Sequence, residues 1–214
     1  MSNRALIPVK ALSQVKSRLA PYLSPSRRAE LVLHMLHHVI TTLQESQTLE
    51  SIAIVSPDKH VLELAQMWGA HAYLEEQQGH NPALHAAALR EIAEGASALL
   101  TISADLPLLS PEDIQNMFAY LHAPTQADVV LAPSRDETGT NALLVRPPLV
   151  IPYLFGEASF SRHLQAAQQR ELHIALYRST GTALDIDTIN DLTSLPAQST
   201  AFLYYEREKQ EHHL

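Results

Sequence analysis

Short runs of apolar residues divide the first half of the chain into a series of predicted strands. Three runs occupy residues 5–9, 52–55 and 99–102, and a weaker one occupies residues 71–74. Each run is too short for a helix and lacks the alternation of apolar and polar positions that marks a half-exposed strand. Strands that are buried on both faces of a parallel sheet have this pattern. We therefore predict that these segments are strands of a mostly parallel sheet.

The stretches between these runs carry start signals for helices. Four times, a residue that can accept a hydrogen bond from the first helical turn is followed by proline, which has no N–H to lose at that position. These pairs are Ser24-Pro25, Ser56-Pro57, Asn81-Pro82 and Ser110-Pro111. Gly69 and Gly95 stand where the second and third helices should end. Alternating strands and helices of this kind indicate a doubly wound α/β fold.

The second half of the chain is less regular. We predict strands over residues 128–132, 142–145, 173–177 and 182–186, a helix over residues 158–170 and a short helix over residues 189–195. No linker is long enough to separate two domains. The simplest organisation is one α/β domain over residues 1–205, followed by a polar tail over residues 206–214.

Composition narrows the possible functions. The chain has 214 residues, of which 46% are hydrophobic and 18% charged, which is an ordinary globular balance. It has no cysteine, which excludes disulfides, thiolate metal sites and a cysteine nucleophile. A net charge of −8 argues against nucleic acid as a partner, although a few converging cations can still bind a phosphate ligand. No apolar run is long enough for a signal peptide or a membrane span, so we expect a cytoplasmic protein without a membrane partner.

Three cations follow the first predicted strand. Lys10 stands at its carboxyl end, and Lys16 and Arg18 follow in the same segment. Ligands of open α/β sheets bind at the carboxyl ends of the strands, where three cations can hold a triphosphate. The alternative is a solvated loop with three ordinary surface charges.

Carboxylates occur at two further places. Asp105 comes directly after a buried strand, and Asp185 and Asp187 are two positions apart at the end of another predicted strand. Residues two apart in an extended segment point to the same side. One or two carboxylates, together with substrate phosphates, suit Mg²⁺. Alternatively, Asp105 caps a loop or the helix at Ser110, and Asp187 caps a helix that begins at Thr188.

Two polar segments have the chemistry of an anion site. Gly139 and Thr140 lie between two predicted strands, and Gly156 and Ser159 open the helix predicted over residues 158–170. Backbone N–H groups and hydroxyls at a helix N-terminus bind anions. Both segments also fit plain turns, because Gly, Ser and Thr are the usual turn residues.

Taken in order along the chain, these pieces resemble the guanylyltransferases of coenzyme F420 biosynthesis. The resemblance covers about residues 4–196. Its motifs are Ile7-Pro8-Val9-Lys10, Lys16-Ser17-Arg18-Leu19-Ala20, Leu23-Ser24-Pro25, Ser103-x-Asp105-Leu106-Pro107-Leu108-Leu109, Gly139-Thr140-Asn141-Ala142-Leu143, Phe155-Gly156-x-x-Ser159-Phe160 and Leu184-Asp185-Ile186-Asp187-Thr188.

The resemblance implies a single nucleotidyltransferase domain of the glycosyltransferase-A-like, Rossmann-like kind. It also implies transfer of GMP from GTP to the phosphate of phosphoenolpyruvate or 2-phospho-L-lactate, with release of pyrophosphate. By position, the residues implied in Mg²⁺ binding are Asp105, Asp185 and Asp187, and those implied in binding the acceptor are Thr140, Gly156 and Ser159. The residues implied at the nucleotide are Lys10, Lys16, Arg18, Gly79 and Asn81, of which the three cations also serve catalysis.

Several alternatives stay open at this point. The fold also suits a nucleotidyltransferase for the molybdenum cofactor or for a sugar phosphate, but those relatives usually have a glycine-rich loop after the first strand. Here that place reads Pro8-Val9-Lys10-Ala11-Leu12, without glycine. A non-catalytic nucleotide-binding module is the third alternative. The identity of the phospho-acid, the choice of guanine over adenine from the residues themselves, and the formation of a homodimer are open as well.

The three carboxylates carry one further expectation. Without Mg²⁺ they should repel one another, because like charges in one site disfavour ionisation. We therefore expect that neutralising Asp187 leaves the metal-free protein at least as stable as before.

Overall fold

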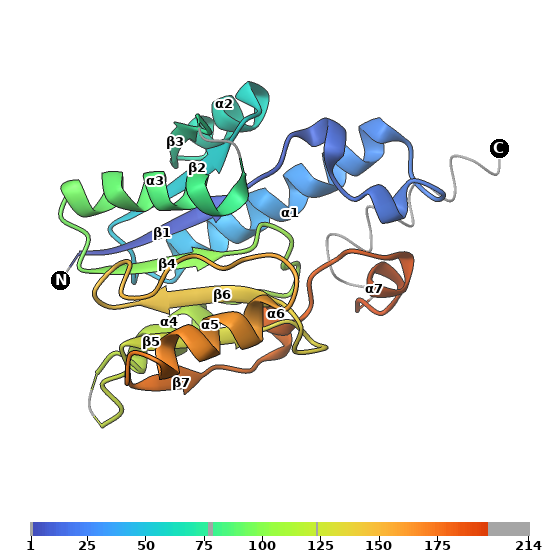
Figure 1. Cartoon of the computed structure of the whole chain (residues 1–214). Coiled ribbons are helices and arrows are strands. Elements are labelled where there is room, and N and C mark those ends of the chain that lie inside the picture. Colours follow the sequence, from blue (N-terminus) through green and yellow to red (C-terminus); the bar gives the residue numbers. More distant parts are fainter. Residues whose placement is uncertain (1, 77–78, 123, 197–214) are drawn as a thin grey trace.

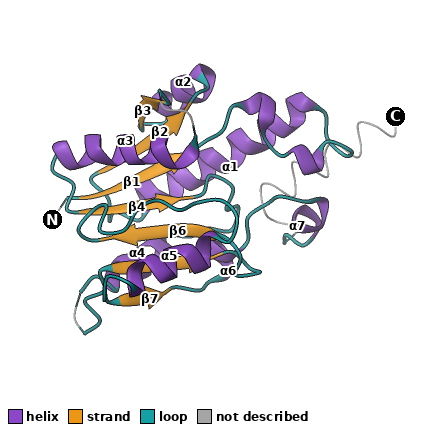
Figure 2. Ribbon diagram, viewed as in Figure 1, coloured by secondary structure: helices purple, strands orange, loops and turns teal. Residues whose placement is uncertain are grey.

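The computed structural model describes residues 2–76, 79–122 and 124–196, and within them seven strands form one sheet (Figures 1 and 2). Every apolar run predicted as a strand in the first half is confirmed. The strands are β1 Asn3–Pro8, β2 Ser51–Ser56, β3 His71–Leu74, β4 Ala98–Ile102, β5 Val129–Pro133, β6 Thr140–Val145 and β7 Ile174–Leu176. The polar tail predicted over residues 206–214 lies outside the described residues.

The sheet is mostly parallel, as predicted. Its strand order is β3-β2-β1-β4-β6-β5-β7. Within this sheet β6 alone runs antiparallel to its neighbours, β4 and β5. The first residues of β6 therefore lie at the same edge as the carboxyl ends of the other strands. This edge collects side chains from both kinds of strand.

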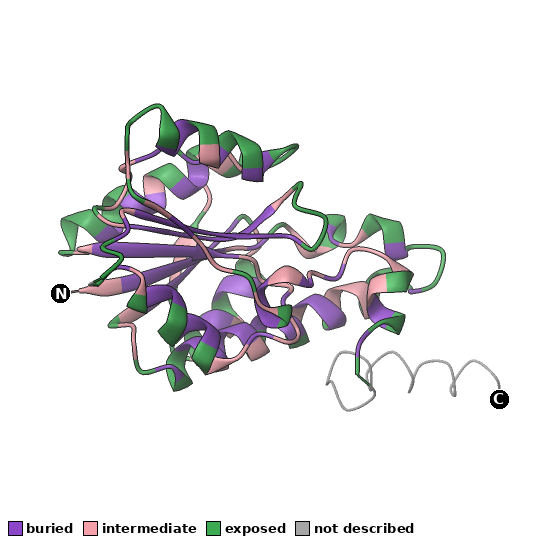
Figure 3. Cartoon of the chain, turned by 90° about the horizontal axis from the view of Figure 1, so that it is seen from below, coloured by how far each residue is buried: buried purple, intermediate pink, exposed green. Residues whose placement is uncertain are grey.

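Helices cover both faces of the sheet. The helices are α1 Pro25–Glu45, α2 Lys59–Met67, α3 His80–Ala93, α4 Pro111–Ala119, α5 Ser159–Gln168, α6 Thr180–Ala183 and α7 Ile189–Thr193, with short 3-10 turns η1 Leu12–Gln14 and η2 Ser17–Leu19. Helices α1, α2 and α4 share one apolar core with the sheet, and α3 and α5 share the other (Figure 1). Figure 3 shows the buried strands between helices whose outer surfaces are exposed.

Alternate residues of each strand enter opposite cores. In β1, Ala5 and Ile7 pack on the side of α1, whereas Leu6 packs on the side of α3. This explains why the strands read as continuous apolar runs in the sequence, since neither face of the sheet meets solvent.

Two of the four predicted helix starts are confirmed. The side chains of Ser24 and Ser110 cap α1 and α4, where they accept hydrogen bonds from the N–H groups of Arg27 and Asp113. Gly69 and Gly95, both with positive φ, follow the ends of α2 and α3, as predicted.

The other two predicted starts are wrong. Ser56 is the last residue of β2, and its hydroxyl accepts from the N–H of Asp58, which caps α2 in its place. Helix α3 begins at His80 with Gly79 at the capping position, so Asn81 already lies in its first turn. In both cases a neighbouring residue stands at the capping position. Ser56 belongs to strand β2, and the Asn81 amide forms hydrogen bonds with Phe155.

The strand predicted over residues 182–186 is also wrong. Its first part belongs to the single turn α6, which Ser179 caps by accepting from the N–H of Thr182. Leu184 and Ile186 are buried, which produces the alternating pattern, but the Ile186 N–H donates to the carbonyl of Asp105 and not to a strand ladder.

Among the helices that the structure describes, none has the length and apolar character needed to cross a membrane.

Candidate active site

The candidate site lies at the sheet edge where β1 and β4 end. The strand order changes direction beside β1, because β2 lies on one side of it and β4 on the other. Open α/β sheets form a ligand crevice at such a switch point. Lys10 follows β1 and Asp105 follows β4, and the turns η1 and η2 and helix α7 lie beyond the same edge (Figure 1).

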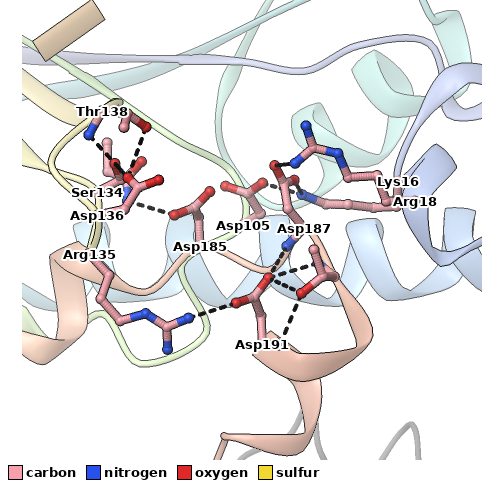
Figure 4. Close-up of polar contacts among 12 residues, drawn as sticks. Lys16, Arg18, Asp105, Ser134, Arg135, Asp136, Thr138, Asp185, Asp187 and Asp191 are labelled. Carbon is pink, nitrogen blue, oxygen red and sulfur yellow. Dashed lines mark hydrogen bonds and ion pairs between the residues drawn. The ribbon is translucent and has the colours of Figure 1, made fainter. Parts of the chain in front are cut away.

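Three carboxylates meet at this edge. Oxygens of Asp105, Asp185 and Asp187 lie within 4.8 Å of one another (Figure 4). The Ile186 N–H donates to the Asp105 carbonyl at 3.2 Å, which ties the two loops together. The Asn141 amide donates to Oδ1 of Asp185 at 3.1 Å. The sequence correctly grouped these carboxylates, although the strand that it proposed for two of them does not form.

Neither carboxylate proposed as a helix cap has that role. Helix α7 begins at Ile189 and is capped by Thr188, whose hydroxyl accepts from the N–H of Asp191. Asp191 in return accepts from the N–H groups of Asp187 and Thr188 at 3.2 and 2.7 Å. Helix α4 is capped by Ser110, so Asp105 is not its cap. The carboxylates of Asp105 and Asp187 are therefore left to face the crevice.

Lys16 inserts among these carboxylates from the other side (Figure 4). Its ammonium donates to Asp105 and, at 3.0 Å, to Asp187 Oδ1, and its side chain is only 8% exposed. The residue has a left-handed backbone, with φ 49°, and the Arg28 guanidinium donates to the neighbouring Val15 carbonyl at 3.0 Å. Arg18 is exposed and lies 3.7 Å from Asp187 Oδ2.

The lysine and its partners shift each other's ionisation. Burial disfavours the charge on Lys16, but the charges of Asp105 and Asp187 outweigh it and raise the pKa of Lys16. Burial likewise opposes ionisation of Asp187, yet Lys16, Arg18 and Lys10 hold the pKa of Asp187 below its ordinary value. Both groups therefore remain charged at neutral pH.

Asp185 has the opposite shift. Burial raises its pKa, and the charge of Asp105 adds to the effect, while the hydrogen bond from Asn141 opposes it. Among the described residues no cationic side chain pairs with this carboxylate, so a bound cation would favour its ionised form.

The donor set fits a hard divalent cation such as Mg²⁺. Three carboxylates converge from two loops, and every donor atom is oxygen. The ammonium of Lys16 already lies between two of them, which shows that the position favours positive charge.

Two adjoining cavities open on this cluster. The smaller has a volume of about 370 Å³ and lies along the β1 loop and the end of β4, and the larger has a volume of about 700 Å³ and extends toward β6 and α5. The residues that line both are Lys10, Arg18, His80, Ser103, Asp105, Phe155 and Asp187. Of the predicted cations and carboxylates, four thus lie where the cavities meet, whereas Lys16 lines only the smaller cavity and Asp185 only the larger.

The three residues expected at an acceptor phosphate line the larger cavity together. Ser159 is the first residue of α5, and its hydroxyl accepts from the N–H of Thr140 at 2.8 Å. Gly156 has φ +116°, a conformation that L side chains rarely adopt, and a Cβ there would meet nothing within 4 Å. The backbone at Gly156 is therefore open to the cavity.

Gly79 and Asn81 do not join the cluster. Neither is among the described residues that line the two cavities. Both polar groups of the Asn81 side-chain amide bind the backbone of Phe155. The amide nitrogen donates to the Phe155 carbonyl at 3.0 Å, and the amide oxygen accepts from the Phe155 N–H at 2.9 Å. Asn81 thus holds a cavity wall in place.

Comparison with known proteins identifies the family. The profile described as guanylyl transferase CofC like matches residues 3–200. The chain belongs to this family of CofC-like guanylyl transferases.

Two relatives of this chain are named as guanylyltransferases. The chain is 42% identical to phosphoenolpyruvate guanylyltransferase from Rubrobacter xylanophilus over 92% of its own length and 95% of that protein. It is 35% identical to 2-phospho-L-lactate guanylyltransferase from Methanothermobacter thermautotrophicus, over 90% of its own length and 83% of that protein. A solved structure from Desulfovibrio desulfuricans G20, described as a nucleotide-diphospho-sugar transferase, has a TM-score of 0.79 at 17% identity and covers 98% of this chain and 96% of its own. That last likeness concerns the fold alone.

Two residues without a predicted role support the acidic cluster of this CofC-like guanylyl transferase. Asn141 positions Asp185, and Asp191 holds the turn that carries Asp187. The spacing of Thr188 and Asp191 resembles a capping box, a signal that marks the start of α7 correctly. Asn141 has no comparable signal, because its partner is 44 positions away.

Proposed function

We propose that this chain transfers GMP from GTP to the phosphate of phosphoenolpyruvate in coenzyme F420 biosynthesis. An oxygen of the acceptor phosphate attacks the α-phosphorus of GTP, a new P–O bond forms, and the bond to the bridging oxygen breaks to release pyrophosphate. The observation that carries the proposal is a cluster of three carboxylates that faces a loop of cations at the junction of two cavities.

The carboxylates of Asp105, Asp185 and Asp187 would hold Mg²⁺, since all three converge on one point. When bound, the ion supplies positive charge that neutralises the phosphates in the transition state.

The cations of the β1 loop bind the triphosphate in this proposal. Lys10 and Arg18 line both cavities and are exposed, so phosphate oxygens in the cavities are within reach of their charges. When GTP binds, the Lys16 ammonium exchanges its hydrogen bonds to Asp105 and Asp187 for hydrogen bonds to the phosphates. A phosphate dianion is already a nucleophile, so the reaction requires alignment and charge neutralisation and no general base.

The acceptor enters the larger cavity in this proposal. The hydroxyls of Thr140 and Ser159 and the backbone at Gly156 gather at its wall beside the N-terminus of α5. A helix N-terminus carries partial positive charge and favours an anion. These groups would therefore bind the acceptor's phosphate and hold it beside the α-phosphate.

Phosphoenolpyruvate is preferred to 2-phospho-L-lactate on similarity. The relative named for phosphoenolpyruvate is 42% identical to this chain, and the one named for 2-phospho-L-lactate is 35% identical. The two acids share a phosphate and a carboxylate and differ at one carbon, so the polar groups of the cavity suit either.

A pyrophosphate-release assay tests the proposal. GTP and ATP are each combined with phosphoenolpyruvate, 2-phospho-L-lactate and 3-phosphoglycerate in the presence of Mg²⁺. We expect the highest kcat/KM with GTP and phosphoenolpyruvate. A preference for 2-phospho-L-lactate would overturn the choice of acceptor, and release with ATP alone would overturn the choice of nucleotide.

A further inference from the structure

A buried histidine lies directly behind the wall of the larger cavity. His163 is in the second turn of α5 and has no exposed surface. Both of its ring nitrogens are engaged. Nδ1 lies 3.0 Å from the hydroxyl oxygen of Thr140, and Nε2 lies 2.9 Å from the backbone nitrogen of Leu154.

These contacts define where the proton lies on the imidazole. The N–H of Leu154 can only donate, so Nε2 must be the unprotonated acceptor. A neutral ring then carries its hydrogen on Nδ1 and donates it to Thr140. Burial lowers the pKa of His163 to about 4, helped by the charge of Arg162 and opposed by a hydrogen bond to the backbone of Ser159, so the ring is neutral at pH 7.

The histidine thereby sets the direction of the hydroxyl that it contacts. Because the Thr140 oxygen accepts from His163, its own hydrogen is left to donate elsewhere. The Ser159 hydroxyl is in the same situation, since it accepts from the N–H of Thr140. Two hydroxyls that line one cavity therefore accept from the protein and keep their hydrogens for a ligand, an arrangement that suits an anion.

The other side of the ring holds the segment that leads to Gly156. His163 fixes the N–H of Leu154, and Asn81 fixes both backbone groups of Phe155. The rings of Phe155 and His163 also meet edge to face, with centroids 4.9 Å apart. The open backbone at Gly156 is thus held from two directions.

We propose that His163 is a positioning residue for the acceptor site, which orients the Thr140 hydroxyl as a donor to the acceptor's anionic group and holds residues 154–156 against the cavity. This inference rests on the proposed function, because it assigns the larger cavity to the acceptor. His163 itself does not touch the substrate.

Two substitutions separate the two contacts of the ring. His163→Gln keeps an acceptor near the position of Nε2 and loses the donor to Thr140, whereas His163→Asn keeps a donor near Nδ1 and loses the acceptor for Leu154. Loss of a hydrogen bond to a charged group corresponds to about a tenfold or larger change in binding. We expect His163→Gln to raise the KM for phosphoenolpyruvate about tenfold while the KM for GTP changes less than twofold. His163→Asn should preserve more of the affinity for the acceptor.

A double-mutant cycle with Thr140→Val distinguishes positioning from a structural role. Thr140→Val removes the hydroxyl and keeps the shape, so His163→Gln should then add little further increase in the KM for phosphoenolpyruvate. An equal increase in both backgrounds, or equal increases for GTP and phosphoenolpyruvate, would overturn the proposal. Melting curves of each variant show whether it is folded.

The tautomer is tested without any substrate. Nitrogen-15 NMR of the histidine rings at pH 7, with the signal assigned by its loss in His163→Gln, should show hydrogen on Nδ1 alone. Hydrogen on Nε2, or on both nitrogens, would overturn the inference whichever phospho-acid is the acceptor. If another phospho-acid proves to be the substrate, the proposed function fails, and the same cycle with that acid decides the role of His163.

Discussion

A lysine ammonium lies among the carboxylates to which we assign the metal ion. Lys16 is buried and contacts both Asp105 and Asp187, while Asp187 also lies near Arg18. A buried charge that loses its partner is strongly unfavourable. In the metal-free protein Lys16 therefore stabilises Asp105 and Asp187 and offsets their mutual repulsion, whereas the charge of Asp105 still disfavours ionisation of Asp185.

Asp187→Asn tests this balance. The substitution leaves Lys16 with one carboxylate fewer, so we expect the metal-free protein in chelator to lose stability. Because the Asp187 side chain is 48% exposed, solvent screens the pair and the loss should be about 0.5–1 kcal/mol. That corresponds to a melting temperature lower by about 1–4 °C. The exposed Glu157→Gln serves as a control, and a variant that melts at or above the wild-type temperature would show that repulsion dominates.

His163 predicts a pH dependence of stability. Its pKa is about 4 in the folded protein, against 6.5 ordinarily, so the unfolded chain binds the proton more tightly. The stabilisation is complete above pH 6.5 and is lost as the pH falls toward 4. Between pH 7 and pH 5 this group should account for about 2 kcal/mol of the decrease in unfolding free energy.

Urea unfolding at the two pH values measures that decrease. In His163→Gln the difference between pH 7 and pH 5 should be smaller than in the wild type by about this amount. An unchanged difference would mean that the pKa of His163 is the same in the folded protein as in the unfolded chain.

Single residues show what the sequence could and could not predict about the site. Asp105, Asp185 and Asp187 were predicted because each has a local signal, a carboxylate at the end of an apolar segment. Lys16 was predicted as well, as one of three cations after the first strand. Its contacts with Asp105 and Asp187 were not predicted, because they join residues 89 and 171 positions apart. The expectation of an electrostatically strained empty site left out this cation, and the melting temperature of Asp187→Asn tests it.

At the level of elements, the start of α5 and the start of β6 form one unit. The Ser159 hydroxyl, at the first position of α5, accepts from the N–H of Thr140, at the first position of β6. Helix and strand thereby present their polar ends to the same cavity. The sequence placed Gly156, Ser159 and Thr140 in two separate candidate turns, and only the antiparallel direction of β6 brings them together.

Ser159→Ala should weaken acceptor binding more than nucleotide binding. It removes a donor at the cavity wall, and we expect the KM for phosphoenolpyruvate to rise about tenfold or more, with little change for GTP. The N–H of Thr140 also loses its acceptor, so stability should fall by about 1–3 kcal/mol.

Ser161→Ala is the matched control for that experiment. Ser161 lies on the same turn of α5 but is exposed, and its hydroxyl donates to the Ala158 carbonyl. Steady-state kinetics of both variants with each substrate varied in turn give the comparison. Equal increases of both KM values in Ser159→Ala would assign this part of the cavity to the nucleotide.

The elements themselves were predicted where a local pattern dominates. The buried strands and the serine caps of α1 and α4 follow directly from neighbouring residues. The caps predicted at Ser56 and Asn81 were wrong because other contacts use those residues. The apolar alternation at Leu184 and Ile186 was taken for a strand, although it reflects burial beside the acidic loop.

At the scale of the whole molecule, the site depends on the order of the strands. The β1 loop, the β4 loop and the segment before α7 meet because β1 and β4 are neighbours. The sequence predicted the α/β class but not this order. It also did not predict the direction of β6, because strand pairing joins segments far apart in the chain.

Mg²⁺ and GTP would bind a site that forms only in the folded chain, so together they should raise its free energy of unfolding. With Mg²⁺ and GTP at about 100 times their dissociation constants, the gain is about 2.7 kcal/mol, or about 5–10 °C in melting temperature. We expect GTP in the presence of chelator to raise the melting temperature less than GTP with Mg²⁺ does. In Asp105→Asn, adding Mg²⁺ to GTP should raise the melting temperature little further. An equal rise with GTP in chelator would contradict the assignment of the carboxylates to a metal.

Phosphorus-31 NMR of the reaction mixture tests the central claim most directly. With the wild-type protein, Mg²⁺, GTP and phosphoenolpyruvate, the account predicts two mutually coupled signals of an unsymmetrical diphosphate, together with pyrophosphate. These signals would show that the phosphate of phosphoenolpyruvate is joined to the α-phosphorus of GTP. Unchanged substrates, or GDP and inorganic phosphate as the products, would contradict the account.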